Sequence, residues 1–410
     1  MRPASRLLWL LFAVNLFNYI DRQILFSVFP AVKTDLALTD TQLGFLASAF
    51  MWVYLSVAPG FGVLADRRSR PRLMGLGVGI WSVATALSGT VRSYGQLLVG
   101  RALVGIGEAS YGSVAPAMLS DAFEPAHRGR ALAIFSMAIP VGSALGYLLG
   151  GLLERAVGWR VAFFLVGVPG AWLAVTVGRL SDPARRGNDP SAPAPRPAGA
   201  RLADYLELLT TKSYLLNCLA MTGMTFAVGG LAAWVPTYLV RVRGMELAEA
   251  NLVFGLLTLV SGVGGTMAGG WLGDRLLTRV PSAYFLVSGA GLALAVPCGA
   301  AVILLGDRAW VLAAIFLAEV FIFLNTGPLN AIVANVSRSE VRATAYAVNI
   351  FVIHALGDAI SPTIVGMVSD RAGLSTAFWV APGALALAAL FCFWGMRTYA
   401  ADARETPRAE

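Results

Sequence analysis

The sequence has few of the residues from which metal and catalytic sites are built. Its 410 residues include two histidines and three cysteines, and only 13% are charged. The cysteines are scattered through apolar stretches, so their spacing fits neither a disulfide framework nor a zinc site. His127 and His354 are too few to provide a nucleophile and base set. We therefore expect no metal site, no cofactor and no enzymatic activity.

Lysine is nearly absent as well. The chain contains only Lys33 and Lys212, and neither follows the glycines of a phosphate-binding loop. The glycine-rich run at 75–79 has no strand before it, so it indicates helix packing and not a dinucleotide site. The chain is not expected to hydrolyse ATP.

Apolar residues are abundant: 57% of the chain is hydrophobic and the mean hydropathy is +0.70. Nine stretches of 18 or more residues hold no charge: 41–65, 73–91, 131–153, 161–178, 213–240, 250–273, 280–306, 320–337 and 372–396. Three more are apolar apart from one or two embedded charges: 7–30, 93–120 and 343–369. A membrane-crossing helix needs about 20 apolar residues. The sequence therefore predicts an all-α integral membrane protein with twelve transmembrane helices.

The positive charge of the chain follows membrane topology. Of 31 basic residues, 21 fall in inside segments, 8 outside and 2 within spans if the N-terminus is cytoplasmic. The positive-inside rule then places both termini in the cytoplasm, and the net charge of +8 needs no nucleic-acid partner. The first apolar run carries Asp21 and Arg22 and lacks a small-residue cleavage site, so we expect it to remain as a helix. Short termini and the preference for Arg over Lys suggest a bacterial inner membrane.

Several motifs of the first half of the chain recur in the second half at a nearly constant offset. The Gly-x-x-x-Asp-Arg pattern that begins at Gly62 returns at Gly270. Arg130-Ala-Leu-Ala returns as Arg342-Ala-Thr-Ala. These repeats indicate that one half of the chain duplicates the other.

A Pro-, Ala- and Arg-rich segment separates the two copies. We expect three parts: an N-terminal six-helix half, 1–180, a cytoplasmic linker, 181–204, and a C-terminal six-helix half, 205–410. Transporters with duplicated bundles bind substrate between the halves, near the bilayer midplane, and expose it to each side in turn. The alternative is a twelve-helix receptor or scaffold without transport.

Four charged residues lie inside predicted spans of the first half: Asp21, Arg22, Arg101 and Glu108. A charge at the bilayer centre costs roughly 2.5 to 3.5 kcal/mol, so each requires a reason. Arg101 and Glu108 are seven residues apart, hence on one helix face and about 10 Å apart along the axis. Two carboxylates that compete for one proton beside movable arginines would couple proton uptake to helix movement. The alternative is a static neutral network that fixes helix register.

The second half carries its own polar residues within spans. Glu319 and Asn330 share a helix face, and His354 precedes Asp358 by four residues. Too few ligands are present for a metal site, so His354 and Asp358 are expected to contact substrate or a neighbouring helix. Glu319 is a second proton site, a substrate contact or a carboxylate satisfied by helix packing; the sequence leaves the three open.

The repeated Gly-x-x-x-Asp-Arg pattern suggests a gate at the cytoplasmic end of the spans. A carboxylate at this position can meet the partial positive charge of a helix N-terminus. The candidate gate residues are Gly62, Asp66, Arg67, Arg70, Asp274 and Arg275.

These residues resemble those of the major facilitator superfamily over nearly the whole chain. The segment from Gly62 to Arg70 resembles the family's loop motif, although Ser69 and Pro71 stand where a glycine and a basic residue are usual. The pattern from Arg101 to Ala109 resembles the family's span-four motif. The resemblance implies two six-helix halves and alternating access.

Finer motifs resemble the spinster-like branch: Asn18-Tyr-Ile-Asp-Arg22, RALVGIGEASYGSVAP at 101–116, FSMAIPVGSALGY at 135–147, AAWVPTYL at 232–239 and the run from His354 to Pro362. This resemblance implies proton-linked transport of an amphipathic lipid-like substrate, such as a lysophospholipid or sphingosine phosphate. Asp21, Arg22, Arg101 and Glu108 would form the proton-coupling network. The same four positions are similar to those of proton symporters of small organic anions such as sugar acids, which remain the alternative.

Further residues are candidates for lining the substrate cavity, and two of them, Trp234 and Tyr238, would suit an acyl chain. They are Asn18, Tyr111, Trp234, Tyr238, Glu319, Asn330, His354 and Asp358. The expected partners are an amphipathic or anionic small molecule, protons and the lipid bilayer, and the chain is expected to act as a monomer.

Overall fold

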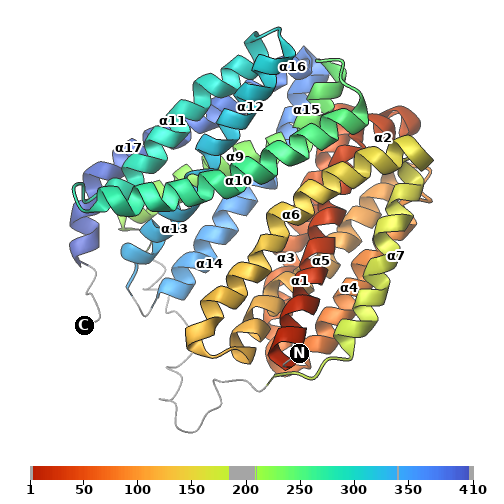
Figure 1. Ribbon diagram of the computed structural model, residues 1–410, viewed down its shortest axis with the longest axis horizontal. Helices are drawn as coiled ribbons and strands as arrows, with labels where there is room; N and C mark the ends of the chain where they lie inside the picture. The colour runs from red at the N-terminus through yellow and green to blue at the C-terminus, as the bar shows by residue number, and fades with distance from the viewer. Residues whose placement is uncertain (1–2, 184–207, 209, 339–340, 406–410) are drawn as a thin grey trace. The chain divides into compact units, whose positions relative to one another are not determined.

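The computed structural model describes residues 3–183, 208, 210–338 and 341–405, and the regular elements in these ranges are all helices (Figure 1). Most of the predicted linker, residues 184–204, lies outside the described residues. The chain forms two compact units. The first comprises residues 1–197 and 235–256, and the second comprises residues 198–234 and 257–410.

The first unit holds the helices of the N-terminal part of the chain: α1 (Pro3–Ser27), α2 (Phe29–Leu36), α3 (Asp40–Arg67), α4 (Arg70–Ser88), α5 (Tyr94–Ala122), α6 (Pro125–Val157) and α7 (Trp159–Gly178). Local signals set several boundaries. Thr39 caps α3 through a capping box with Gln42. Ser93 accepts a hydrogen bond from the backbone of Gln96 at the start of α5.

Glycines allow these helices to approach closely. Helix α1 packs along α6, where an added Cβ at Gly142 would lie 2.7 Å from the carbonyl oxygen of Leu16. Helix α4 packs against α5, where a Cβ at Gly107 would lie 2.5 Å from the carbonyl oxygen of Gly77. The run at 75–79 thus serves helix packing, as the sequence predicts.

The remaining helices are α9 (Lys212–Arg241), α10 (Leu247–Leu277), α11 (Ala283–Leu304), α12 (Arg308–Phe323), α13 (Thr326–Asn335), α14 (Arg342–Ile353), the π-helical turn η2 (His354–Asp358), α15 (Ser361–Ala372), α16 (Leu374–Ala377) and α17 (Val380–Glu405). Residues 235–256, which close α9 and open α10, belong to the first unit. In the second unit α11 packs against α12 and α17. Gly265 lies against the backbone of Val320, so α10 and α12 are also in close contact.

Two predicted spans of the second half are interrupted helices. The span 320–337 breaks after Phe323, where the Asn325 side chain bonds to the carbonyls of Phe321 and Ile322. Such local bonds compete with the helical ladder. The span 343–369 contains the π-helical turn η2, which ends at Asp358. A hydropathy pattern cannot show these breaks because the residues around them stay apolar.

Nine helices or helix runs of the described residues are long and apolar enough to cross a membrane. Every predicted span corresponds to a helix or a run of helices, but α1, α4 and α5 fall outside the nine. Of these three helices, α1 and α5 carry embedded charges. The protein is therefore an all-α membrane protein, while the full count of twelve crossings stays a prediction.

Backbone conformation repeats at nearly the same offset as the sequence motifs. Gly158 and Gly373 stand at this spacing and share nearly the same dihedral angles, φ 82°, ψ 157° and φ 84°, ψ 155°. Ala37 and Gly244 form a second pair, with φ of 50° and 66°. These four are the residues with positive φ in the described backbone. A conformation that L-residues rarely adopt thus occurs in two matched pairs, which supports duplication of the two halves.

Candidate functional site

The first unit contains a buried ion pair between α1 and α5. The Nε of Arg22 donates a hydrogen bond to Oε2 of Glu108 at 2.6 Å. The Glu108 side chain is fully enclosed, and the Arg22 side chain is 19% exposed. The structure therefore brings together two of the four charges that the sequence assigned to one network.

The other arginine is held by an aromatic ring. The guanidinium carbons of Arg22 and Arg101 lie 4.9 Å and 5.0 Å from the centre of the Phe50 ring. Tyr19 and Tyr54 also contact Arg22, at 5.1 Å and 5.5 Å. Aromatic faces attract guanidinium groups, most strongly when water is excluded. Sequence analysis missed this aromatic group, although the spacing of four residues between Phe50 and Tyr54 places them on one face of α3.

Asp21 points to a different neighbour from Arg22. It is buried and accepts a hydrogen bond from the hydroxyl of Thr85 on α4. It also interacts electrostatically with Arg101, Glu108 and Arg22. Successive side chains on a helix diverge by about 100°, so adjacent residues face different helices. The four predicted charges thus form one electrostatic group, within which Arg22 and Glu108 make the direct contact.

Several buried polar atoms of this group lack a hydrogen-bond partner among the described residues. They are Asn18 Nδ2, Asp21 Oδ1, Arg101 Nε and Glu108 Oε1. Buried polar atoms are nearly always paired, so a cluster of unpaired ones marks a site that can take a proton or a polar ligand group. The predicted network residues therefore form one polar site within the first unit, and Asn18 lies one helical turn before Asp21 and Arg22 on α1.

Arg70, a candidate gate residue, forms a compact ion cluster at the start of α4. Its Nη1 donates to Asp121 at 2.5 Å, its Nε to Asp182 at 2.7 Å and its Nη2 to the carbonyl of Pro183 at 2.7 Å. Burial lowers the pKa of Arg70, but the bonds to Asp121 and Asp182 outweigh burial and raise it. Arg70 thus stays charged and ties α4 to the end of α5 and to the segment that follows α7. Sequence analysis did not identify Asp121 or Asp182.

The other gate candidates lie near helix ends. Gly62, Asp66 and Arg67 are in the last turns of α3, and an added Cβ at Gly62 would meet open space. In the second unit Asp274 accepts a hydrogen bond from Tyr284 at 2.8 Å. The guanidinium of Arg275 lies 5.2 Å from the centre of the Trp271 ring. The gating role of these residues stays a prediction.

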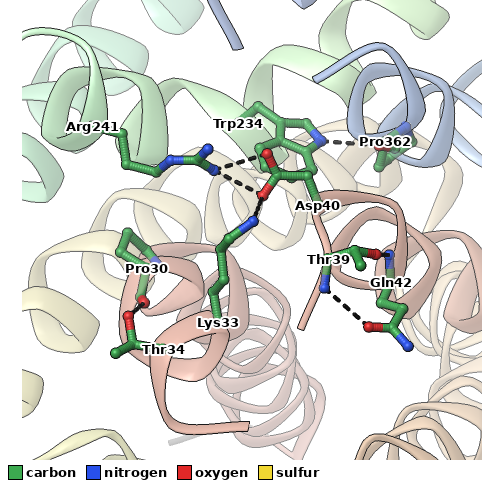
Figure 2. A network of polar contacts seen from close by, with 9 residues as sticks. All are labelled: Pro30, Lys33, Thr34, Thr39, Asp40, Gln42, Trp234, Arg241 and Pro362. Atoms are coloured by element: carbon green, nitrogen blue, oxygen red, sulfur yellow. Dashed lines mark hydrogen bonds and ion pairs between the residues drawn. The ribbon is translucent and has the colours of Figure 1, made fainter. Parts of the chain in front are cut away.

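The aromatic candidates for the substrate cavity are enclosed by protein in this structure. Tyr111 donates to the carbonyl of Leu11 at 2.5 Å, and Trp234 donates to the carbonyl of Pro362 at 2.9 Å (Figure 2). The Tyr238 hydroxyl accepts a hydrogen bond from Arg243 at 2.9 Å. All three side chains are at most 2% exposed. In this conformation they pack the helices, and their contact with substrate stays a prediction.

The polar candidates of the second half make separate local contacts. Glu319 bonds to the hydroxyls of Thr258 and Ser261. The Nδ1 of His354 lies 3.0 Å from both carboxylate oxygens of Asp358 within the π-helical turn. The side chain of Asn330 donates to the carbonyl of Thr326 one turn earlier. No group of three or more possible metal ligands occurs among the described residues.

A second buried ion cluster of the first unit was missed from sequence. Arg241, the last residue of α9, donates from Nη1 to both carboxylate oxygens of Asp40, at 2.8 Å and 2.9 Å (Figure 2). Lys33 of α2 also binds Asp40. The Asp40 side chain is only 2% exposed. One carboxylate at the start of α3 therefore holds two cations that sit far apart in the sequence.

Comparison with known proteins identifies the family. The sequence profile of the Major Facilitator Superfamily matches residues 11–362. Protein spinster homolog 1 of Homo sapiens is 35% identical, and the alignment covers 87% of this chain and 71% of the human protein. The protein of the same name from Xenopus tropicalis is 32% identical, with coverage of 95% and 78%. This chain belongs to the spinster family of the major facilitator superfamily.

Other spinster relatives and solved structures agree. Protein spinster of Drosophila melanogaster is 34% identical over 87% of this chain, which spans 60% of the length of that protein. A bacterial homolog to the human lysosomal transporter spinster, in an inward-facing and unoccupied conformation, has a TM-score of 0.89 at 24% identity, covering 98% of both chains. A D-xylose-proton symporter has a TM-score of 0.74 at 14% identity, covering 94% of this chain and 96% of its own. Both structures share the fold.

Spinster-family membership establishes the general role. The chain is an integral membrane transporter of the major facilitator type and not an enzyme, and transporters of this superfamily carry small molecules. The resemblance inferred from the sequence motifs is confirmed.

Proposed function

We propose that the protein is a proton-linked secondary transporter of an amphipathic, anionic, lipid-like molecule that works by alternating access. The observation that carries this proposal is the buried ion pair of Arg22 and Glu108, with Asp21 and Arg101 in the same electrostatic group. The substrate class is that of lysophospholipids or sphingosine phosphates, which the resemblance to spinster-like proteins implies.

Charge balance explains how the group can couple a proton to an anion. Two arginines and two carboxylates have zero net charge when all four are ionised. A single proton on Glu108 or Asp21 leaves a net charge of +1 in an enclosed site. An uncompensated buried charge is costly, so an anionic head group then restores neutrality. Proton binding and anion binding at this site therefore favour each other.

The released arginine provides the contact for the anion. Glu108 holds Arg22 through a charge-assisted hydrogen bond of 2.6 Å. A proton on Glu108 removes this charge, and Arg22, which is 19% exposed, becomes available to a phosphate or carboxylate group. Phe50, Tyr19 and Tyr54 keep the guanidinium in place meanwhile.

The alternative is a proton-coupled symporter of small organic anions such as sugar acids. The charge balance above applies equally to a sugar acid, and the same fold occurs in a D-xylose-proton symporter. We favour the lipid-like substrate because the resemblance of the sequence motifs to spinster-like proteins implies it.

The remaining parts of the proposal concern topology and gating. We place both termini in the cytoplasm of a bacterium and the spans in its inner membrane, with halves 1–180 and 205–410 joined by the linker 181–204. Asp66 and Asp274 with their neighbouring arginines would close the cytoplasmic side. The protein would act as a monomer.

The test is flux in proteoliposomes with an imposed pH gradient, comparing a labelled lysophospholipid with a labelled sugar acid. Gradient-dependent movement of the lysophospholipid supports the proposal, and movement of the sugar acid alone selects the alternative. Glu108→Gln and Asp21→Asn should abolish the gradient-driven component that depends on this network. Asp307→Asn is the matched control, because Asp307 caps α12 outside the network and asparagine caps equally well. Unchanged gradient-driven flux in both network variants would refute the coupling role.

A further inference from the structure

Glu319 of α12 is a buried carboxyl group of the second unit that takes no part in the contacts of the charge network. Its Oε1 accepts a hydrogen bond from Thr258 Oγ1 at 2.7 Å, and its Oε2 lies 2.9 Å from Ser261 Oγ. Both hydroxyls come from α10. The residue is 9% exposed. Within the described part of the chain, its hydrogen bonds are thus to two neutral hydroxyls and to no cation.

The sequences of α10, α11 and α12 supply no other charge at the level of Glu319. Helix α11, which packs against α12, holds no Asp, Glu, Lys, Arg or His, and its titratable groups are Tyr284 and Cys298. The charged residue of α10 nearest to Thr258 is Glu249, nine residues away, or about 13 Å along the axis. On α12 it is Arg308, eleven residues before Glu319, or about 16 Å.

The position within the span makes ionisation still less favourable. The helix run from Arg308 to Asn335, which is interrupted after Phe323, has 28 residues. Glu319 lies about 16 Å from its start, close to the middle of a hydrocarbon layer about 30 Å thick. Carboxylates at this depth normally pair with a cation or carry a proton.

The number of hydrogens available for hydrogen bonds distinguishes ionised from protonated Glu319. Ser261 Oγ also lies 2.7 Å from the carbonyl oxygen of Leu257, and a hydroxyl has one hydrogen to donate. If Glu319 is ionised, Ser261 can satisfy either Leu257 or Glu319, but not both. If Oε2 carries a proton, it donates to Ser261, Ser261 donates to Leu257, and Thr258 donates to Oε1. The protonated form satisfies these three contacts at once and leaves only the longer approach of Ser261 Oγ to the carbonyl oxygen of Thr258, at 3.4 Å, without a hydrogen.

We propose that Glu319, Thr258 and Ser261 form a second proton-binding site, which holds a proton in the conformation seen here and exchanges it during transport. The exchange rests on the proposed function, since it needs proton-linked transport; the bound proton does not. The transporter would then move one proton more per cycle than the charge network of the first unit alone accounts for.

The test is infrared spectroscopy of the reconstituted protein at neutral pH, using the carbonyl band of protonated carboxyl groups. Glu319→Gln should remove intensity equal to one carboxyl group, whereas the control Asp307→Asn should remove none. Thr258→Val keeps Glu319 but removes the donor to Oε1, so the band should shift to higher frequency. An unchanged band in Glu319→Gln would show that Glu319 is ionised and would overturn the proposal. No shift in Thr258→Val would show that Thr258 does not bind the carboxyl group and would overturn the three-residue site.

A transport measurement provides a second test of the proposal. The number of protons moved per substrate, obtained from the substrate gradient that balances a known pH gradient, should fall by one in Glu319→Gln. An unchanged proton number would overturn the exchange step. If Glu108→Gln and Asp21→Asn leave coupling intact while the infrared band still responds to Glu319→Gln, the proposed network fails and the bound proton stands.

Discussion

Arg22 binds Glu108 and not its neighbour Asp21 because helix geometry separates adjacent side chains. The two carboxylates therefore have different partners: Glu108 has an arginine and Asp21 has the hydroxyl of Thr85. This difference matters for coupling. A proton added to Glu108 directly changes the contact with Arg22, whereas a proton added to Asp21 changes a contact with a hydroxyl.

Phe50 should be essential to the arrangement of the two arginines. Its ring lies within 5.0 Å of both guanidinium carbons. Phe50→Leu keeps an apolar side chain but removes the aromatic face, a loss of about 0.5 to 2 kcal/mol. We expect gradient-driven flux to fall about tenfold at limiting substrate, since about 1.4 kcal/mol corresponds to a factor of ten. Phe45→Leu, on the exposed face of the same helix, should leave the flux unchanged; an equal loss in both variants would contradict the role of the ring.

The residue types of the network could be predicted from sequence, but their contacts could not. Charges inside apolar spans identify Asp21, Arg22, Arg101 and Glu108 because any such charge is costly. Which carboxylate meets which arginine depends on helix rotation, which a hydropathy pattern does not contain. Phe50 could not be predicted, because the sequence does not show whether an aromatic residue in a span faces lipid or a guanidinium group. Asp121 and Asp182 escaped because they lie in ordinary polar segments at or beyond helix ends.

At the scale of helices, contact between α4 and α5 depends on small residues. Gly107→Ala would place a Cβ 2.5 Å from the carbonyl oxygen of Gly77 and 2.7 Å from the backbone nitrogen of Trp81. Backbone atoms cannot move aside easily, so we expect a loss of about 1 to 3 kcal/mol and a lower Tm in detergent. Gly95→Ala on the same helix meets open space and should leave Tm unchanged or slightly higher. Equal Tm for both variants would show that the contact is not tight.

The Asp40 cluster predicts an unequal response of its members. Asp40→Asn leaves Lys33 and Arg241 facing each other without their anion and should destabilise the protein by about 1 to 3 kcal/mol. Arg241→Gln leaves Asp40 paired with Lys33, so its cost should be smaller. Glu246→Gln removes an exposed partner of Arg155 and should leave Tm unchanged. Thermal unfolding in detergent gives the order of destabilisation by the three substitutions. A larger loss of Tm in Arg241→Gln than in Asp40→Asn would contradict the role of Asp40 as the shared anion.

The helices themselves were largely predictable because membrane-spanning segments are set by hydropathy, and each predicted span has its helix. The interruptions of the helices at Asn325 and at the turn His354–Asp358 could not be predicted from hydropathy. They arise from side-chain bonds to the backbone and from local packing, and their residues are apolar or neutral enough to fit an unbroken span. The packing role of the glycine run at 75–79 was predictable, because no strand precedes it and small residues let membrane helices approach closely.

At the scale of the whole molecule, duplication connects the sequence to the transport mechanism. The motif at Gly62 recurs at Gly270, and the positive φ of Gly158 recurs at Gly373, with nearly equal offsets. The buried carboxyl groups of the two units have different settings: Glu108 binds an arginine in the first, and the hydrogen bonds of Glu319 in the second are to two hydroxyls. A duplicated fold with unlike sites can use one copy to bind an anion and the other to hold a proton.

The most direct test of the central claim measures proton movement itself. Proteoliposomes containing a pH-sensitive dye, with equal pH on both sides, are given a gradient of the transported substrate. In the wild type the internal pH should change as substrate moves down its gradient. In Glu108→Gln the substrate should still move, but the internal pH should change less per substrate, because only the proton exchanged by Glu319 remains. Substrate movement without any pH change in the wild type, or the same pH change in Glu108→Gln, would contradict proton coupling through the Arg22 and Glu108 pair.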